Sequence, residues 1–199
     1  MSNSVTIEQI LKSWLENRGI RDQAVFEHCL DIVSLQSVDK GEYLVRAGQD
    51  SHFLFLIHLG LLRLYYTSAE GKERNKAFYG QGDITGAVSA ALTNSPAPFN
   101  IQALEASLVL RAEFHQLFRD DQKHPALTRL AMTLLSEAFI RNEQREAMLL
   151  TCTAEQRYQW LCEREPHLLE QLPQLHIASY IGVDAVSLSR LKRKLKPGS

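Results

Sequence analysis

Residues 174–193 read QLHIASYIGVDAVSLSRLKR, two short segments with apolar periodicity separated by a glycine. A helix-turn-helix needs a small residue where its helices touch and a glycine at its left-handed turn. Ala178 and Gly182 occupy these two positions. The other packing positions hold aliphatic side chains, at Ile177, Ile181, Val183, Leu188 and Leu191. The pattern therefore predicts helices at about 173–181 and 184–195 that pack as a helix-turn-helix.

The faces of the second helix favour DNA binding over a plain helical hairpin with a glycine turn. At ~100° per residue, Leu188, Leu191 and Leu195 gather on one side, which we expect to face the core. The residues expected at a major groove are Val186, Ser187, Ser189, Arg190, Arg193 and Lys194. Arg190 is the best candidate for a bidentate guanine contact, because it combines a fixed charge with a planar donor fork.

The C-terminal end of the chain is basic, whereas the remainder is acidic. Residues 184–199 carry a net charge of +4 and the rest carry −5. This asymmetry predicts an anionic partner, double-stranded DNA, although a solubilising tail would give the same charge. We expect Lys194 to hold phosphates and Asp184 to be the N-cap of its helix. Because the sequence stops at Ser199, we expect no full β-hairpin wing.

The middle of the chain, about residues 34–112, has the pattern of short strands. Glycines recur between β-prone runs at 42–46, 53–57 and 61–66. Short strands at regular spacing with glycine turns predict a sandwich or a barrel. Glu70-Gly71-Lys72 is typical of a hairpin tip.

Capping boxes predict two further helices. Thr6 with Gln9 marks a helix at about 6–17, and Thr153 with Gln156 marks one at about 154–164. We expect Pro166 to end the latter. A short helix at about 22–30 should bury Phe26 and Leu30.

A long helix is predicted from about Pro125 to Leu150. Leu127, Leu130, Leu134 and Ala138 form one stripe, which Ala131 and Leu135 widen. The stripe is wider than a two-in-seven seam, so the helix could pack on its own domain and on a partner at once. Because helix-turn-helix proteins often read DNA as two-fold dimers, we predict a homodimer with Leu127, Leu130 and Leu134 in or near its seam.

Composition is that of an ordinary globular protein, with 199 residues, 45% hydrophobic and 23% charged. The longest apolar run, 53–57, is far shorter than a membrane helix, and the N-terminus does not resemble a secretory signal. We therefore expect a cytoplasmic protein with no membrane partner. Cys29, Cys152 and Cys162 form no Cys-x-x-Cys, so we expect no disulfide framework, no metal and no cofactor.

The order of these parts resembles the cyclic-AMP receptor and fumarate–nitrate regulator (Crp/Fnr) superfamily of bacterial transcription factors. The resemblance covers about residues 6–196. The motifs that carry it are Lys40-Gly41-Glu42, Ala47-Gly48, Phe55 to Gly60, Gly71-Lys72-Glu73, Gly82-Asp83-Ile84-x-Gly86, Thr153 to Tyr158 and Leu188-Ser189-Arg190.

This resemblance implies an α+β fold with three parts. A cyclic-nucleotide-binding-type β-roll (jelly roll) with flanking helices would occupy residues 1–123. A long dimerisation helix would occupy 124–150, and a helix-turn-helix DNA-binding domain lacking a full wing would occupy 151–199. The implied function is that of a dimeric, DNA-binding transcription regulator.

The resemblance also locates an effector pocket in the roll, at Gly86, Ala87, Val88, Ala97, Phe99 and Asn100. In cyclic-nucleotide-binding relatives a Glu takes the ribose hydroxyl and an Arg takes the cyclic phosphate; these positions correspond to Ala87 and Ala97. Losing the Arg removes a charge-assisted contact worth ~1.5–3 kcal/mol. We therefore expect an unidentified small-molecule effector other than cyclic AMP, or a roll that is only a scaffold.

The sequence also departs from the resembled family outside the effector pocket. Ala185 and Val186 stand where cyclic-AMP-binding relatives carry Arg and Glu in the recognition helix. The cysteine cluster of the iron–sulfur relatives is absent from the N-terminus, whereas haem is left open. We expect no catalytic residues, since the chain has no His-x-His, nucleophile elbow or Walker loop. The alternative function is a sensor or interaction module without sequence-specific DNA binding.

Overall fold

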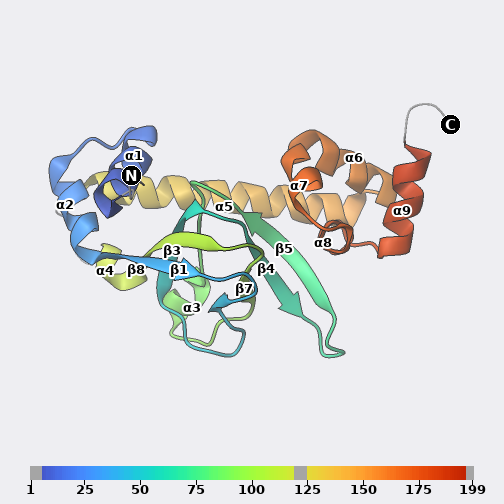
Figure 1. Cartoon of the computed structure of the whole chain (residues 1–199), viewed down its shortest axis with the longest axis horizontal. Helices are drawn as coiled ribbons and strands as arrows, with labels where there is room; N and C mark the ends of the chain where they lie inside the picture. The colour runs from blue at the N-terminus through green and yellow to red at the C-terminus, as the bar shows by residue number, and fades with distance from the viewer. Residues whose placement is uncertain (1–5, 119–124, 196–199) are drawn as a thin grey trace, which may run out of the picture. The chain divides into compact units, whose positions relative to one another are not determined.

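The computed structural model describes residues 6–118 and 125–195, and these form two compact units. The first combines the residues up to Tyr66 with Ala77–Leu134. The second combines Thr67–Lys76 with the residues from Leu135 onward. The boundary therefore falls inside the long helix α5 (Pro125–Thr151; Figure 1), and residues 67–76 belong to the second unit.

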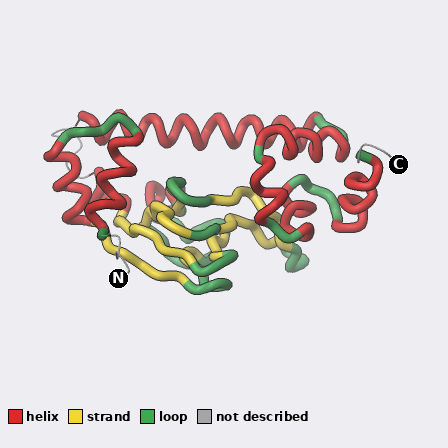
Figure 2. The backbone as a smooth tube through the Cα atoms, turned by 45° about the horizontal axis from the view of Figure 1, so that its top comes forward, coloured by secondary structure: helices red, strands yellow, loops and turns green. Residues whose placement is uncertain are grey.

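Two four-stranded sheets form the body of the described roll (Figure 2). The first has the order β1 (Val33–Val38), β8 (Ser107–Glu113), β3 (Phe53–Leu59), β6 (Ile84–Gly86). The second has the order β2 (Tyr43–Val45), β7 (Asn100–Ala103), β4 (Leu62–Thr67), β5 (Glu73–Tyr79). Strands distant in sequence pair antiparallel, as Leu35 does with Leu110. The sandwich predicted from the glycine-punctuated runs is confirmed.

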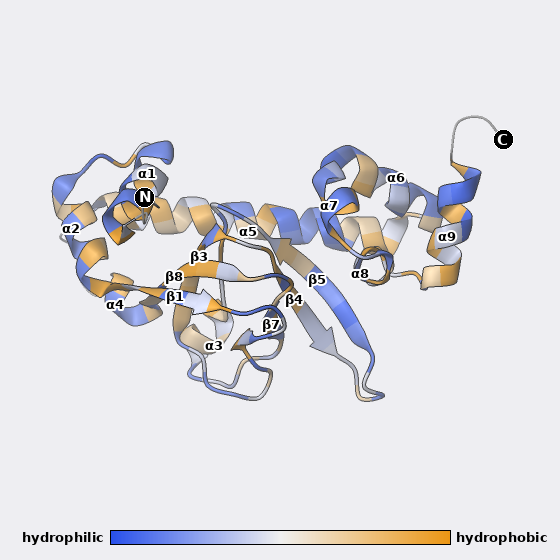
Figure 3. Ribbon diagram, viewed as in Figure 1, coloured by the Kyte–Doolittle hydropathy of each residue, from blue (hydrophilic) through white to orange (hydrophobic). Residues whose placement is uncertain are grey.

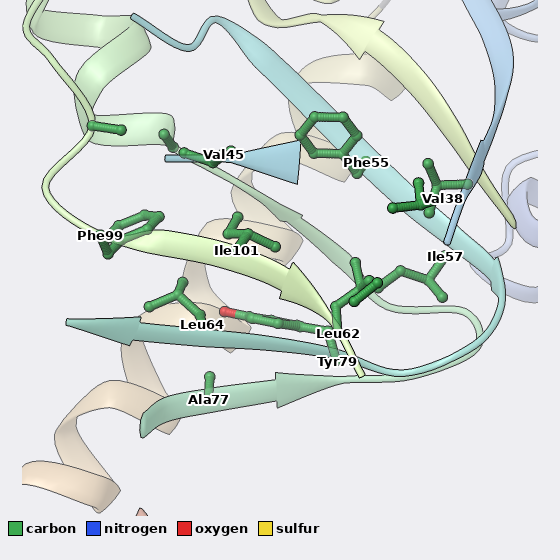
Figure 4. Close-up of a cluster of buried hydrophobic side chains, with 14 of the residues drawn as sticks. Val38, Val45, Phe55, Ile57, Leu62, Leu64, Ala77, Tyr79, Phe99 and Ile101 are labelled. Carbon is green, nitrogen blue, oxygen red and sulfur yellow. The ribbon is translucent and has the colours of Figure 1, made fainter. Parts of the chain in front are cut away.

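The interior of the roll is a single cluster of buried apolar side chains (Figure 4). In β3, Phe55 and Ile57 join this cluster, whereas Leu54 and Leu56 lie on the other face of the sheet. This is the two-residue alternation of a strand that is covered on both sides. β3 is therefore almost continuously apolar in sequence.

A second apolar cluster joins the outer face of the β1–β8–β3–β6 sheet to helices of the first unit. These helices are α1 (Ile7–Asn17), α2 (Gln23–Ile32), α4 (Phe114–Phe118) and the start of α5. The predicted capping box of α1 is confirmed, with the Gln9 amide donating to the Thr6 hydroxyl at 3.3 Å.

The predicted burial of Phe26 and Leu30 in α2 is confirmed in part. Val25 and Cys29 are buried, whereas Phe26 and Leu30 are only partly buried. Asp22 caps α2, because its side chain accepts from the amides of Ala24 and Val25. Phe26 and Leu30 lie ~100° around the helix from Val25 and Cys29, and they also pack against the second apolar cluster.

The remaining elements agree with the predicted turns. The hairpin at 70–72 is confirmed, since the Ser68 amide donates to the Lys72 carbonyl at 2.9 Å. A short helix, α3 (Val88–Thr93), follows β6. Pro166 does not simply end a helix: α6 (Ala154–Arg164) stops before it, and it opens α7 (Pro166–Gln171), where a missing amide hydrogen is tolerated.

The second unit ends in the helix pair α8 (Gln174–Tyr180) and α9 (Ala185–Lys194), close to the predicted bounds. Hydrophilic residues gather toward the C-terminal end of α9, as Figure 3 shows by colour. Among the described residues, no helix is both long enough and apolar enough to cross a membrane.

Candidate nucleic-acid interface

The turn between α8 and α9 has the geometry that its sequence predicts. Gly182 has a φ of +69°, the left-handed region that favours glycine. The Val183 amide donates to the Ala178 carbonyl at 2.9 Å, which closes the end of α8. Ala178 is buried between the helices, and Leu188 is fully buried beneath α9. These contacts fix the direction in which α9 leaves the turn.

Arg157 of α6 braces the same turn from outside the helix pair. Its Nη1 donates to the carbonyl of Ile181 at 2.9 Å and to that of Gly182 at 3.4 Å. A Cβ added at Gly182 would lie 2.8 Å from this Nη1. The φ of this residue therefore favours glycine, and an added Cβ would also displace the end of the Arg157 side chain. The sequence placed Arg157 in a family motif but did not reveal this contact.

Asp184 caps α9 as predicted. Its Oδ1 accepts from the Ser187 amide at 2.8 Å, and its Oδ2 accepts from the Ser187 hydroxyl at 2.9 Å. These hydrogen bonds lower the pKa of the Asp184 carboxyl, since they stabilise its charged form. The Ser187 hydroxyl, expected at DNA, is thus committed to the cap of its own helix.

The outer face of α9 carries the other residues expected at DNA. Ser189, Arg190 and Arg193 are exposed, and Val186 is 60% exposed. Leu191 and Leu195 lie half-buried on the same side as Leu188. The buried and exposed faces of α9 are therefore the ones that the helix angles predict.

Lys194 is also exposed, but it forms an ion pair. Its Nζ lies 2.5 Å from Oε2 of Glu155, at the start of α6. An ion pair this exposed contributes little to stability, but the Glu155 carboxylate would compete with a phosphate for the same ammonium. This pair could not be predicted from the sequence, because its two residues are 39 positions apart in the chain.

The first helix of the pair, α8, is anchored by the hairpin of the second unit. Asn75 is buried, and its amide donates to the Ser179 hydroxyl at 3.0 Å. The Asn75 side-chain amide donates to the His176 carbonyl at 3.2 Å. Because a buried polar group needs such partners, Asn75 specifies where α8 meets the hairpin.

Three of the six residues expected to form an effector pocket belong to the buried apolar cluster of the roll. Ala87, Ala97 and Phe99 are buried members of the apolar cluster inside the roll. Val88 begins α3 and is half-buried. The side chain of Asn100 accepts from the Ala47 amide at 3.0 Å, an internal contact of the roll.

Gly86 is held by close packing against β3. A Cβ at this position would lie 2.5 Å from the carbonyl oxygen of Phe53. Gly86 therefore allows β6 to lie close to β3. None of the six predicted pocket residues has a charged side chain that could bind a phosphate.

The residues expected at the dimer seam pack mostly inside their own unit. Leu127 is fully buried and Leu130 is 8% exposed, both in the cluster with α1 and α2, and Leu134 is half-buried. The exposed large apolar side chains in the middle of α5 are instead Met132, Leu135, Phe139 and Ile140. The wide stripe read from the sequence therefore divides into an inner face and an outer face. Across the described residues, no group of three His, Cys, Asp or Glu side chains could hold a metal ion.

Comparisons with known proteins agree with these parts. Residues 35–121 match the family model of the cyclic nucleotide-binding domain. The fumarate and nitrate reduction regulatory protein of Yersinia pestis is 28% identical over 181 residues, covering 83% of this chain and 72% of the relative. The protein of the same name from Vibrio cholerae is 32% identical over 114 residues, 57% of this chain and 44% of its own length.

Among solved structures, FixK2 from Bradyrhizobium japonicum aligns with a TM-score of 0.71 at 17% identity. The alignment covers 84% of this chain and 90% of FixK2, and it supports the fold alone. The sequence comparisons and the two-sheet roll followed by a helix-turn-helix lead to one conclusion. The chain is a homologue of proteins named fumarate and nitrate reduction regulatory protein, and its residues 35–121 match the cyclic nucleotide-binding domain.

Proposed function

We propose that the chain is a transcription regulator that reads duplex DNA with α9. The observation that carries the proposal is the outer face of α9, where Arg190 is exposed on the side opposite the buried Leu188. A guanidinium in this place can donate two hydrogen bonds to O6 and N7 of a guanine. Val186 offers an apolar surface for a thymine methyl. A regulator of this kind acts in the cytoplasm.

In this proposal, three parts of the chain have different roles. Residues up to about 123 form the sensing roll, 124–150 join two copies, and 151–199 bind DNA. Two-fold symmetry would place two copies of α9 on successive half-sites of a duplex. The exposed side chains of Met132, Leu135 and Phe139, spaced three and four residues apart along α5, support a helical seam between the copies.

The effector of the proposed regulator is not cyclic AMP. Ala87 and Ala97 offer no charge to the ribose or the phosphate, and both lie within packed apolar side chains. Burying a phosphate without a partner is strongly unfavourable. In a calorimetric titration we expect no binding, and a dissociation constant below ~100 µM, equivalent to about −5.5 kcal/mol, would contradict this part of the proposal.

The salt dependence of duplex binding tests whether α9 and its lysines contact DNA. We expect Lys194→Ala to weaken binding to all sequences alike and to reduce the slope of log affinity against log salt by about one. Glu155→Gln should strengthen binding to all sequences, because it frees the Lys194 ammonium from its ion pair. Arg21→Ala, which removes a positive charge from an exposed loop of the first unit, is the matched control and should change neither.

Absence of duplex binding by the wild-type chain at low salt would overturn the proposal. The chain would then be a sensor or interaction module that retains the helix pair without using it on DNA. The unit would still fold in that case, so thermal unfolding of the same samples separates loss of binding from loss of structure.

A further inference from the structure

A cavity of about 70 Å³ lies in the first unit, outside the interior of the roll. Its floor is the outer face of the first sheet, at Leu54, Leu56 and Ala112, and its other walls come from α1, α2 and α5. Leu54 and Leu56 point away from the cluster that contains Phe55 and Ile57. The cavity is therefore separate from the roll interior to which the family resemblance assigns an effector.

The lining of this cavity excludes a charged or strongly polar ligand. No described residue that lines it carries a charged side chain. The Trp14 indole nitrogen already donates to the Gly82 carbonyl at 2.8 Å. The Cys29 thiol is buried, and burial raises its pKa to about 11, so it is neutral near pH 7. A ligand that needed hydrogen bonds would lose its hydration here without compensation.

The size of the cavity sets the size of its ligand. One water needs ~10–15 Å³, and an apolar cavity of ~150 Å³ stays dry and accepts benzene or xenon. At about 70 Å³ the cavity suits xenon or a hydrocarbon of a few carbons. Water is a poor occupant, because it would find almost no hydrogen-bonding partners on these walls.

The cavity also borders the long helix. Leu127, Leu130, Ala131 and Leu134 of α5 all line it. Leu135, one residue further along, is exposed on the outer face of the same helix. A bound molecule would therefore contact the face of α5 that packs against the first sheet.

We propose that this cavity is a binding site for a small, uncharged, apolar molecule, held between the first sheet and the start of α5. The claim concerns binding to the first unit and does not depend on DNA recognition. Occupancy would add contacts to Leu130 and Leu134, and so would strengthen the attachment of α5 to the sheet.

Xenon is a suitable probe, and its binding is measured by methyl NMR on the 199-residue chain under increasing gas pressure. We expect saturable shifts of the Leu130 and Leu134 methyl groups, with the methyl groups of the roll interior unchanged. Acetate, similar in size but charged, should cause no shifts. Saturable xenon shifts confined to other sites would overturn the proposal.

Two variants fill the cavity from opposite walls. Ala131→Leu fills it from α5, and Ala112→Val fills it from β8, where a β-branched side chain suits a strand. Each should weaken xenon binding at least tenfold, and the use of two keeps the test valid if one fails to fold. Ala147→Leu, at an exposed position on the same helix, is the control and should bind as the wild type does.

A side chain from a second copy is the competing occupant. In that case the shifts at fixed xenon pressure would shrink as protein concentration rises, because the second copy would exclude the gas. That result would overturn the proposal, as would unchanged xenon shifts in both filled variants.

Discussion

Arg145 of α5 donates a hydrogen bond from Nη2 to the carbonyl of Asn75 at 2.7 Å, although 70 residues separate them in sequence. The same Nη2 donates to the Tyr180 carbonyl at 2.8 Å, and Nε donates to the Lys76 carbonyl at 2.7 Å. One guanidinium thus ties three segments of the second unit together. Burial lowers the pKa of Arg145, but an arginine remains charged at any physiological pH.

Arg145→Met should destabilise the second unit by ~2–4 kcal/mol, because it leaves three backbone carbonyls without their charged donor. Urea unfolding monitored by helix content would measure the change. Gln144→Met, an exposed neighbour on the same helix, should alter stability by less than ~0.5 kcal/mol. Equal stability of Arg145→Met and the wild type would show that these carbonyls do not depend on the guanidinium.

Gly182→Ala should destabilise the helix-turn-helix by ~1–3 kcal/mol, since alanine is strained at a φ of +69° and its Cβ would crowd Arg157. Unfolding of Arg157→Ala, Gly182→Ala and the double variant forms a thermodynamic cycle. We expect the double variant to lose less than the sum of the two single changes, because the crowding is then removed. Strict additivity would rule out the contact as a cause.

Leu135→Asp should convert a dimer into a folded monomer, whereas Leu130→Asp should unfold the first unit. Leu135 is 51% exposed, but Leu130 is only 8% exposed and packs against its own sheet and helices. An aspartate at the buried site would be an uncompensated charge. Sedimentation at micromolar concentration, with circular dichroism on the same samples, separates the two effects. A dimer that survives Leu135→Asp would exclude this face of α5 from the seam.

Stability should fall between about pH 9 and about pH 11 through the Cys29 thiol. Its pKa is raised from 9.0 to about 11 in the folded chain, so the unfolded chain loses the proton first as pH rises. Stability therefore decreases with pH across this interval, by up to ~2 kcal/mol. Denaturant midpoints of Cys29→Ala should show a shallower decline over the same range. Parallel declines in both proteins would assign the effect to other groups.

Local features were predictable from the sequence because their partners are near in the chain. Thr6 with Gln9, Thr153 with Gln156 and Asp184 with Ser187 act within a single helical turn. Gly182 could be recognised because only glycine adopts its backbone conformation without strain. The fold class followed from the order of such local signals.

Contacts that depend on tertiary packing were not predictable. The division of the α5 stripe into a buried Leu130 and an exposed Leu135 depends on which side meets the sheet. The Arg145–Asn75 and Lys194–Glu155 pairs join residues whose proximity no periodicity reveals. The burial of Ala97 and Phe99 depends on how side chains from several strands pack together.

Selection from a random duplex library, performed with the wild type and with Arg190→Ala, tests whether α9 reads sequence. We predict that the wild type enriches a two-fold motif. Arg190→Ala should lose preference at one base position in each half-site and bind ~1–3 kcal/mol more weakly per half-site. If the wild type enriches no motif, or if Arg190→Ala retains both the motif and the affinity, α9 does not recognise DNA through Arg190.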